Sequence, residues 1–201
     1  MCIRDRDADS SNFALKILKE ISSYAKAAAE ESNMRFALAH RPGDEAAIRL
    51  AELDVEEYGA GSTVVQGLRK YPYYTDLVGV PPTEKIPLDD RLAIEAKLQS
   101  PADGGHLLPI NLNPGKLDPD SFVKLVEKIC GSEIEFFTLE SMYSLCRNCQ
   151  KWFLGVIPTC TFCGSDNLQQ MGRSSAVITP VSIWPNAKAR TLDKLTQYSF
   201  S

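Results

Sequence analysis

The stretch Cys146-Arg-Asn-Cys149, followed after ten residues by Cys160-Thr-Phe-Cys163, decides how the end of this chain folds. Two Cys-x-x-Cys pairs on short turns can place four thiolates at the corners of a tetrahedron, which is the arrangement that zinc prefers. Gly164 follows the last cysteine, where a tight turn favours a residue that tolerates positive φ. We therefore predict a small four-cysteine zinc-ribbon module over residues 141–170, whose folding depends on the metal.

Four thiolates leave no open coordination position, so the predicted metal is structural and not catalytic. Mononuclear iron is the less favoured alternative, because a tetrahedron of four thiolates does not choose its metal alone. Four unrelated buried cysteines are a further alternative, which the paired spacing disfavours. Cys2 and Cys130 remain, and we expect neither to bind metal, since one lies at the terminus and the other ends a predicted helix.

The composition is that of an ordinary soluble protein, with 201 residues of which 44% are hydrophobic and 24% are charged. The net charge of −4 argues against a nucleic-acid partner, which would require clustered lysine and arginine. No apolar run approaches the length of a membrane span, and residues 1–10 lack the apolar core of a secretory signal. Six cysteines without an export signal favour a reducing, cytoplasmic location. Residues 1–10 also lack apolar periodicity, and we expect the chain to be a fragment or the downstream half of a split gene.

Residues 10–140 predict an α/β domain with parallel strands, because helical and strand patterns alternate there. Helices are predicted over residues 10–32, 45–58 and 88–98 and from Asp118-Pro119 onward, and strands over 34–39, 106–112 and 134–138. A tail over residues 171–201 follows the metal module. The apolar residues at helical spacing are Phe13, Ile17, Ile21 and Ala28 in the first helix, Ala47, Leu50, Ala51 and Leu53 in the second, and Phe122, Leu125, Val126 and Ile129 in the fourth.

Other polar and aromatic residues give weaker signals. His40 and His106, the only histidines, lie at the edges of apolar segments, and we expect satisfied edge histidines and not ligands or bases. Tyr73 and Tyr74 could line a pocket, but core packing is the commoner fate of tyrosines beside a proline. The sequence contains neither a glycine-rich phosphate loop nor a nucleophile elbow.

Several of these segments resemble a known family. Residues 143–149 and 160–165, then Arg173, Pro180-Val181 and Trp184, resemble the C-terminal end of anaerobic (class III) ribonucleoside-triphosphate reductase. Residues 35–58, 71–77 (YPYYTDL) and 88–105 are similar to segments upstream of that end. The resemblance covers about residues 10–201, and its most specific parts are the cysteine set and the PYYT segment.

This resemblance implies a section of a larger enzyme. The family is built on a ten-stranded glycyl-radical-enzyme barrel, of which residues 10–140 would be the C-terminal part. A separate iron–sulfur activase generates the glycyl radical with S-adenosylmethionine, and the radical passes to a barrel cysteine that attacks the ribose. The implied partners are therefore that activase and the upstream barrel portion, and a homodimer stays open. The zinc module resembles the family's structural site, which supports the radical loop.

Two departures affect the expected activity. The family pattern is Arg, two residues, Gly and Tyr, whereas Arg173 is followed by two serines and then Ala176. Ala176 thus stands at the expected radical glycine position, where its methyl group crowds hydrogen abstraction. Gly172 comes four residues too early. The family's catalytic cysteines belong to upstream regions, so we assign no catalytic residue and expect no activity from this chain alone. A non-catalytic zinc-ribbon assembly or regulatory subunit is the alternative, and an isolated redox iron protein is a third.

Overall fold

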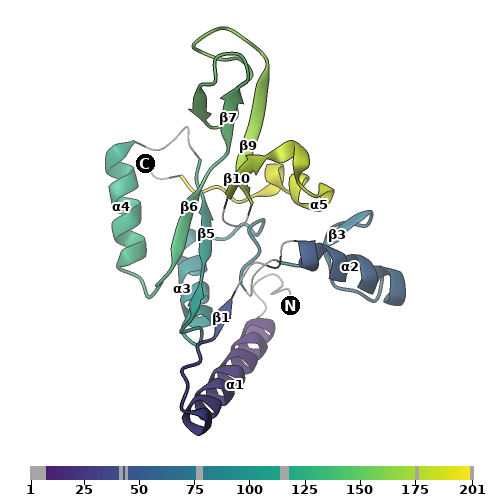
Figure 1. Ribbon diagram of the computed structural model, residues 1–201, viewed down its shortest axis with the longest axis vertical. Coiled ribbons are helices and arrows are strands. Elements are labelled where there is room, and N and C mark those ends of the chain that lie inside the picture. Colours follow the sequence, from purple (N-terminus) through teal and green to yellow (C-terminus); the bar gives the residue numbers. More distant parts are fainter. Residues whose placement is uncertain are drawn as a thin grey trace.

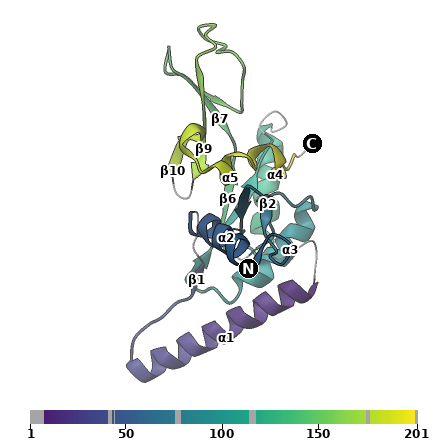
Figure 2. The same ribbon diagram turned by 90° about the vertical axis from the view of Figure 1, so that its right-hand side faces the viewer.

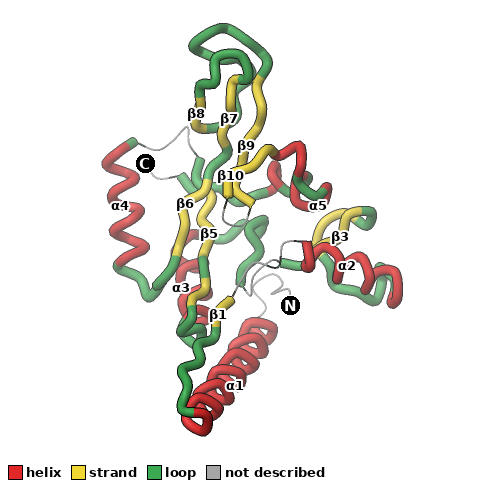
Figure 3. The backbone as a smooth tube through the Cα atoms, in the orientation of Figure 1, coloured by secondary structure: helices red, strands yellow, loops and turns green. Residues whose placement is uncertain are grey.

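The computed structural model describes residues 8–40, 43, 45–75, 79–113, 118–174 and 177–199, with side chains from residue 11 onward. It has a mixed α/β architecture, shown in Figures 1 and 3. The helices are α1 (Ala8–Ser32), α2 (Glu45–Tyr58), α3 (Leu88–Gln99), α4 (Pro119–Cys130) and α5 (Asn186–Ala189), with 3-10 turns η2 (Val181–Ile183) and η3 (Leu192–Lys194). The strands are β1 (Ala39–His40), β2 (Gln66–Leu68), β3 (Tyr71–Tyr73), β4 (Gly105–His106), β5 (Leu108–Asn111), β6 (Phe137–Glu140), β7 (Tyr143–Cys146), β8 (Trp152–Leu154), β9 (Leu168–Ser174) and β10 (Val177–Pro180).

Parallel pairing, as predicted, occurs in the body of the molecule. Strand β5 pairs with β6, and β1 pairs with β4, both in parallel. Helix α4 connects β5 to β6, which makes a β-α-β unit. The short antiparallel pair of β2 and β3 was not predicted. The strand predicted over residues 134–138 begins three residues later than expected, at Phe137.

The β-α-β unit builds the main hydrophobic core. Apolar residues of α3, β5 and α4 pack together, so the two helices and the strand pair share one buried layer. Tyr198 joins them from the C-terminal segment, and its hydroxyl donates to the Ile86 carbonyl at 3.2 Å. The buried members are Leu88, Leu92, Ala96, Leu108, Ile110, Leu112, Leu125, Ile129, Ile134 and Tyr198.

Helix α4 begins as the sequence predicted. The Asp118 carboxylate accepts a hydrogen bond from the Ser121 amide at 3.0 Å, and Pro119 occupies the first turn. Leu125 and Ile129 are buried as expected. Phe122 is exposed, so its predicted inward orientation was wrong.

Helix α1 buries a different face from the apolar one. Ala14 and Leu18 are buried beside Leu98 of α3. Phe13, Ile17 and Ile21, which share the predicted apolar spacing, are exposed. Figure 2 shows α1 lying across the end of the molecule that is opposite β7 and β9.

Two further burial predictions were wrong. Residues 34–38 form no strand, and Met34 and Phe36 are exposed; only Ala39 and His40 of this region pair in a strand. Helix α2 has the predicted bounds, yet it buries Ala51 while Leu50 and Leu53 are exposed.

Candidate metal centre and the adjoining cavity

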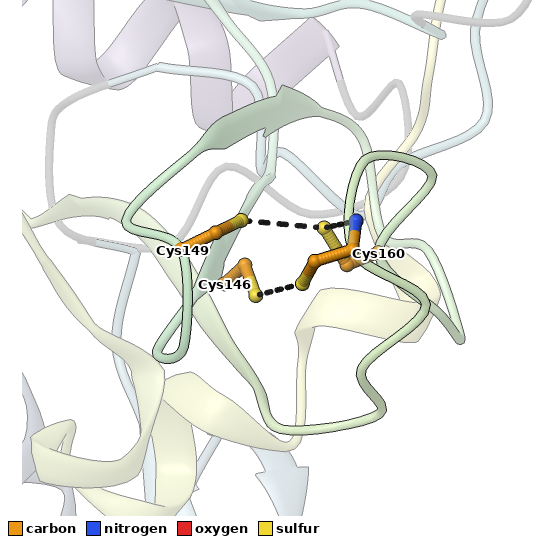
Figure 4. Close-up of side chains that lie close together, drawn as sticks. Cys146, Cys149 and Cys160 are labelled. Carbon is orange, nitrogen blue, oxygen red and sulfur yellow. Dashed lines mark hydrogen bonds between the residues drawn. The ribbon is translucent and has the colours of Figure 1, made fainter.

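The four predicted cysteines form a cluster that could bind a metal ion. Their four sulfur atoms all lie within 4.8 Å of one another. The Sγ atoms of Cys146 and Cys163 are 3.6 Å apart, as are those of Cys149 and Cys160. A tetrahedron with Zn–S bonds of about 2.3 Å has S–S edges of about 3.8 Å, so the cluster has the right size. Figure 4 shows the thiols of Cys146, Cys149 and Cys160 facing one another.

Two turns of the same geometry hold these thiols. The Gln150 amide donates to the Cys146 carbonyl and the Gly164 amide to the Cys160 carbonyl, each at 2.9 Å. The residue after each second cysteine has positive φ, 58° at Gln150 and 72° at Gly164. Gly164, after the last cysteine, thus has the predicted positive φ. In the first turn Gln150 adopts the same conformation, which is uncommon for a residue with a side chain.

Two of the thiols also differ in acidity, because the groups around them shift their pKa values in opposite directions. The Cys149 amide, with smaller contributions from Asn148 and two thiols, lowers the pKa of Cys146 to about 6 against the opposing effect of burial. The Ser165 amide favours the thiolate of Cys163, but burial and the three neighbouring thiols outweigh it and raise the pKa of Cys163 to about 12. At neutral pH the cluster therefore offers a thiolate at Cys146, and metal binding must displace a proton from Cys163.

A four-stranded antiparallel sheet in the order β10-β9-β7-β8 connects this cluster to the body. Strand β7 ends at Cys146, opposite Leu168 at the start of β9. Strand β9 then runs from the cluster to Ser174, which pairs with Val177 of β10. Ala176 lies outside the described residues, so its role at the radical position stays a prediction from the sequence.

Gly172 of β9 has a packing role. A Cβ atom at this position would lie 2.7 Å from Cη2 of Trp184 and 3.0 Å from Sδ of Met142. The Trp184 indole nitrogen donates to Thr179 Oγ1 at 2.8 Å, which holds the ring against the strand. The close approach of the indole to the β9 backbone thus requires glycine.

A cavity of about 230 Å³ lies at the other end of β9. Residues from distant parts of the sequence line it, including the PYYT segment, α3, the β4–β5 region, β9 and α5. Tyr73 and Tyr74 are among them, so the pocket role that we ranked lower is the one observed. The Tyr74 hydroxyl donates to Asp54 Oδ2 at 2.5 Å, which fixes the ring.

One wall of the cavity carries a charged group linked to β9. Arg173 Nε lies 3.6 Å from Glu140 Oε1, and Arg173 Nη1 donates to Thr138 Oγ1 at 2.5 Å. Burial raises the pKa of Glu140, although Arg173 and Lys188 act in the opposite direction. Lys188 Nζ donates to Ser174 Oγ at 3.2 Å, so α5 holds the end of β9 at the cavity.

The two histidines are in contact, and one of them lines the cavity. His40 Nδ1 and His106 Nδ1 are 2.8 Å apart, and His106 Nε2 lies 3.5 Å from Glu95 Oε2. His106 is buried and lines the cavity, and both of its ring nitrogens have a polar partner, as predicted for a satisfied histidine. Each histidine ends a two-residue strand, but no sequence signal indicated that β1 and β4 would pair.

Comparisons with known proteins agree with this architecture. A family model described as anaerobic ribonucleoside-triphosphate reductase matches residues 4–196. A solved anaerobic ribonucleotide reductase superimposes with a TM-score of 0.78 at 19% identity, over 96% of this chain and 30% of that structure. The anaerobic ribonucleotide reductase from Thermotoga maritima in complex with dATP and CTP superimposes with a TM-score of 0.71 at 21% identity, over 91% of this chain and 28% of that structure.

This chain therefore spans less than a third of the solved structures that it matches. No curated protein sequence is significantly similar to it. Among the described residues, no helix has both the length and the hydropathy needed to cross a bilayer. Because the family model covers nearly the whole sequence, the chain belongs to the anaerobic ribonucleoside-triphosphate reductase family.

Proposed function

We propose that this chain is the C-terminal segment of an anaerobic ribonucleoside-triphosphate reductase, which converts a ribonucleotide to a deoxyribonucleotide by a radical mechanism. One observation carries the proposal: β9 runs without interruption from the four-cysteine cluster to the cavity, and ends at the turn where the resemblance places the radical loop. In this proposal, the cluster holds a structural zinc ion that fixes one end of the strand. Iron is the less favoured metal.

Residues 10–140 are, in this proposal, the C-terminal section of the ten-stranded barrel. The parallel pairs β1–β4 and β5–β6 are separate two-stranded sheets, too few strands to close a barrel without the missing part. The upstream portion of the reductase is the proposed partner that completes it. Residues 141–170 form the zinc-binding module, and residues 171–201 form the tail that carries the loop. The family chemistry further implies a radical S-adenosylmethionine activase and a cytoplasmic location, and a homodimer remains open.

The chain's own contribution to the chemistry is positional. Arg173 and Lys188 bring charged and hydrogen-bonding groups to the end of β9, and Trp184 packs against its backbone. We assign no catalytic residue, since Ala176 replaces the expected radical glycine and the catalytic cysteines are expected upstream. The chain alone is therefore proposed to be inactive.

Electron paramagnetic resonance tests this proposal directly. The wild-type chain and an Ala176→Gly variant would be treated anaerobically with a class III activase and S-adenosylmethionine. We expect no glycyl doublet from the wild type and a doublet from the variant, because only glycine offers an uncrowded α-hydrogen at that position. A doublet from the wild type would refute the role assigned to Ala176.

A non-catalytic assembly or regulatory subunit is the second candidate. The exposure of Trp152, Leu154 and Phe162 on the metal module favours it, because a protein-binding surface would present such side chains. The two candidates differ in the neighbouring genes: an adjacent reading frame that encodes the upstream barrel with its cysteines supports the split enzyme. Reductase activity after mixing the upstream product with the Ala176→Gly form of this chain would decide for that enzyme.

A further inference from the structure

Three titratable side chains stand in a row from the cavity wall into the protein. Glu95 and His106 line the cavity and are each only 2% exposed. His106 Nε2 faces Glu95 Oε2 at 3.5 Å, and His106 Nδ1 faces His40 Nδ1 at 2.8 Å. The parallel register of β1 and β4 places His40 directly opposite His106. The contact between the two imidazoles therefore follows from the pairing of β1 with β4 as well as from the side-chain rotamers.

The neighbours of Glu95 hold its carboxylate at this place. The Val80 amide donates to Glu95 Oε1 at 2.8 Å. A Cβ atom at Gly79 would lie 2.8 Å from both carboxylate oxygens, so the backbone approaches the carboxylate closely. Arg91, one turn earlier on α3, donates from Nη2 to the Val80 carbonyl at 2.9 Å, and its buried Nε has no hydrogen-bond partner among the described residues. Glu95 thus presents its second oxygen to His106.

Two ring nitrogens at 2.8 Å can share only one hydrogen. If both Nδ1 atoms were protonated, their N–H bonds would point at each other, so the pair cannot be doubly charged in this geometry. Burial, followed by the charge on His106, lowers the pKa of His40, while Glu95 raises it. The pair therefore accepts one extra proton, balanced by one carboxylate. His40 Nε2 is buried and has no hydrogen-bond partner among the described residues.

We propose that Glu95, His106 and His40 form a proton relay that exchanges a single proton with a ligand in the cavity. In one direction the step begins with a cationic His40, a neutral His106 protonated at Nε2 and an ionised Glu95. His40 gives its Nδ1 proton to His106 Nδ1, and His106 gives its Nε2 proton to Glu95. The products are a neutral His40, the other neutral tautomer of His106 and a protonated Glu95, so charge and protons balance. Glu95 then gives this proton to the ligand and is ionised again, and the three side chains together have lost one proton. The 3.5 Å contact needs a ring movement of about 0.5 Å to reach hydrogen-bond length.

The relay would supply what removal of a hydroxyl group as water requires, namely a proton on the leaving oxygen. This assignment rests on the proposed reductase function. Other charged residues lie on neighbouring elements: Asp103 accepts from the Leu38 amide at 2.8 Å just before β1, and Glu140, Arg173 and Lys188 line the same cavity.

Nuclear magnetic resonance can test the relay without any enzymatic activity. The chain has only two histidines, so ¹⁵N-histidine labelling gives two rings that single replacements assign. Between about pH 8 and pH 5 we expect the pair to take up one proton and not two. Glu95→Gln should lower the pKa of His40, because it removes a carboxylate whose charge raises it. His106→Gln should raise the pKa of His40, because it removes the repelling charge.

Glu140→Gln is the matched control, since it removes a carboxylate from the same cavity and leaves both histidine titrations as in the wild type. Two rings that titrate independently, and that ignore both Glu95→Gln and each other's replacement, would overturn the relay. If His106→Gln fails to fold, Glu95→Gln and His40→Gln still show whether the two rings titrate independently.

Activity provides the second arm once the Ala176→Gly chain, which is expected to carry the radical, is assembled with its upstream part. His40 is not among the cavity-lining residues, so His40→Gln should change the pH dependence of kcat and leave KM unchanged. An unchanged pH profile in an active assembly would overturn the catalytic use of the relay. An inactive Ala176→Gly assembly would count against the proposed function and leave the titration result standing.

Discussion

Replacing Gly172 with alanine should destabilise the protein through one specific collision. The added Cβ would lie 2.7 Å from Cη2 of Trp184, whereas carbon atoms in contact prefer about 3.5 Å or more, so strand and indole must separate by about 0.8 Å. The ring resists because its nitrogen is bonded to Thr179. Overpacking of this kind costs about 1–3 kcal/mol. Where alanine can adopt the native backbone conformation, Gly→Ala stabilises a protein by about 0.4–1 kcal/mol. The sign of the change in the free energy of unfolding therefore distinguishes a collision at Gly172 from an ordinary Gly→Ala substitution.

Urea unfolding followed by circular dichroism, with zinc present throughout, measures this effect. Gly61→Ala is the matched control, because a Cβ there meets nothing within 4 Å, and it should be neutral or slightly stabilising. In a Trp184→Phe background, where the colliding ring atoms are gone, the cost of Gly172→Ala should shrink. A Gly172→Ala variant as stable as the wild type, or equally destabilised in both backgrounds, would refute the packing argument.

Three further substitutions test the core, a helix cap and the metal cluster. Ile110→Ala should lower the free energy of unfolding by about 2–5 kcal/mol because its side chain is fully buried, while Ile183→Ala, at a 69% exposed position, should change it little. Asp118→Ala should lower the melting temperature by removing the contact with Ser121. That contact lowers the pKa of Asp118 in the folded state, so the wild type should be more stable than the variant above the ordinary aspartate pKa and lose this advantage as the pH falls through the folded value. A difference in melting temperature that does not depend on pH would contradict this. Cys149→Ser should reduce the zinc content, measured by plasma mass spectrometry, from about one ion per chain towards zero, and an unchanged stoichiometry would exclude the four-thiolate site.

Local signals in the sequence predicted local structure well. The spacing of the cysteines identified the cluster, because each pair and its turn are encoded within a few neighbouring residues. The Asp118-Pro119 pair identified the start of α4 because a cap needs only a side chain and the next turn. The bounds of α2 were also predicted correctly from its periodicity and its flanking breakers.

Long-range features could not be predicted in this way. The contact between His40 and His106 joins residues that are 66 positions apart, through two-residue strands that leave almost no pattern. The cavity gathers residues from positions 47 to 197, so no window of sequence contains it. The apolar spacing of Phe13, Ile17 and Ile21 correctly indicated a helix, but it did not indicate which face the rest of this chain covers.

Because β9 is uninterrupted, the direction in which the side chains point at one of its ends determines the direction at the other end. Side chains alternate along a strand, so a single inserted or deleted residue between Leu168 and Arg173 would turn Arg173 away from Glu140 while the cysteine turns stayed as they are. An even-numbered change would restore the facing but move the hairpin by about 6.8 Å per residue pair. The number of residues between the cysteine cluster and Arg173 is therefore constrained in two ways: whether it is odd or even, and how large it is. A metal-binding ribbon from another protein could replace this one only if it had the same number of residues between its last ligand and the arginine.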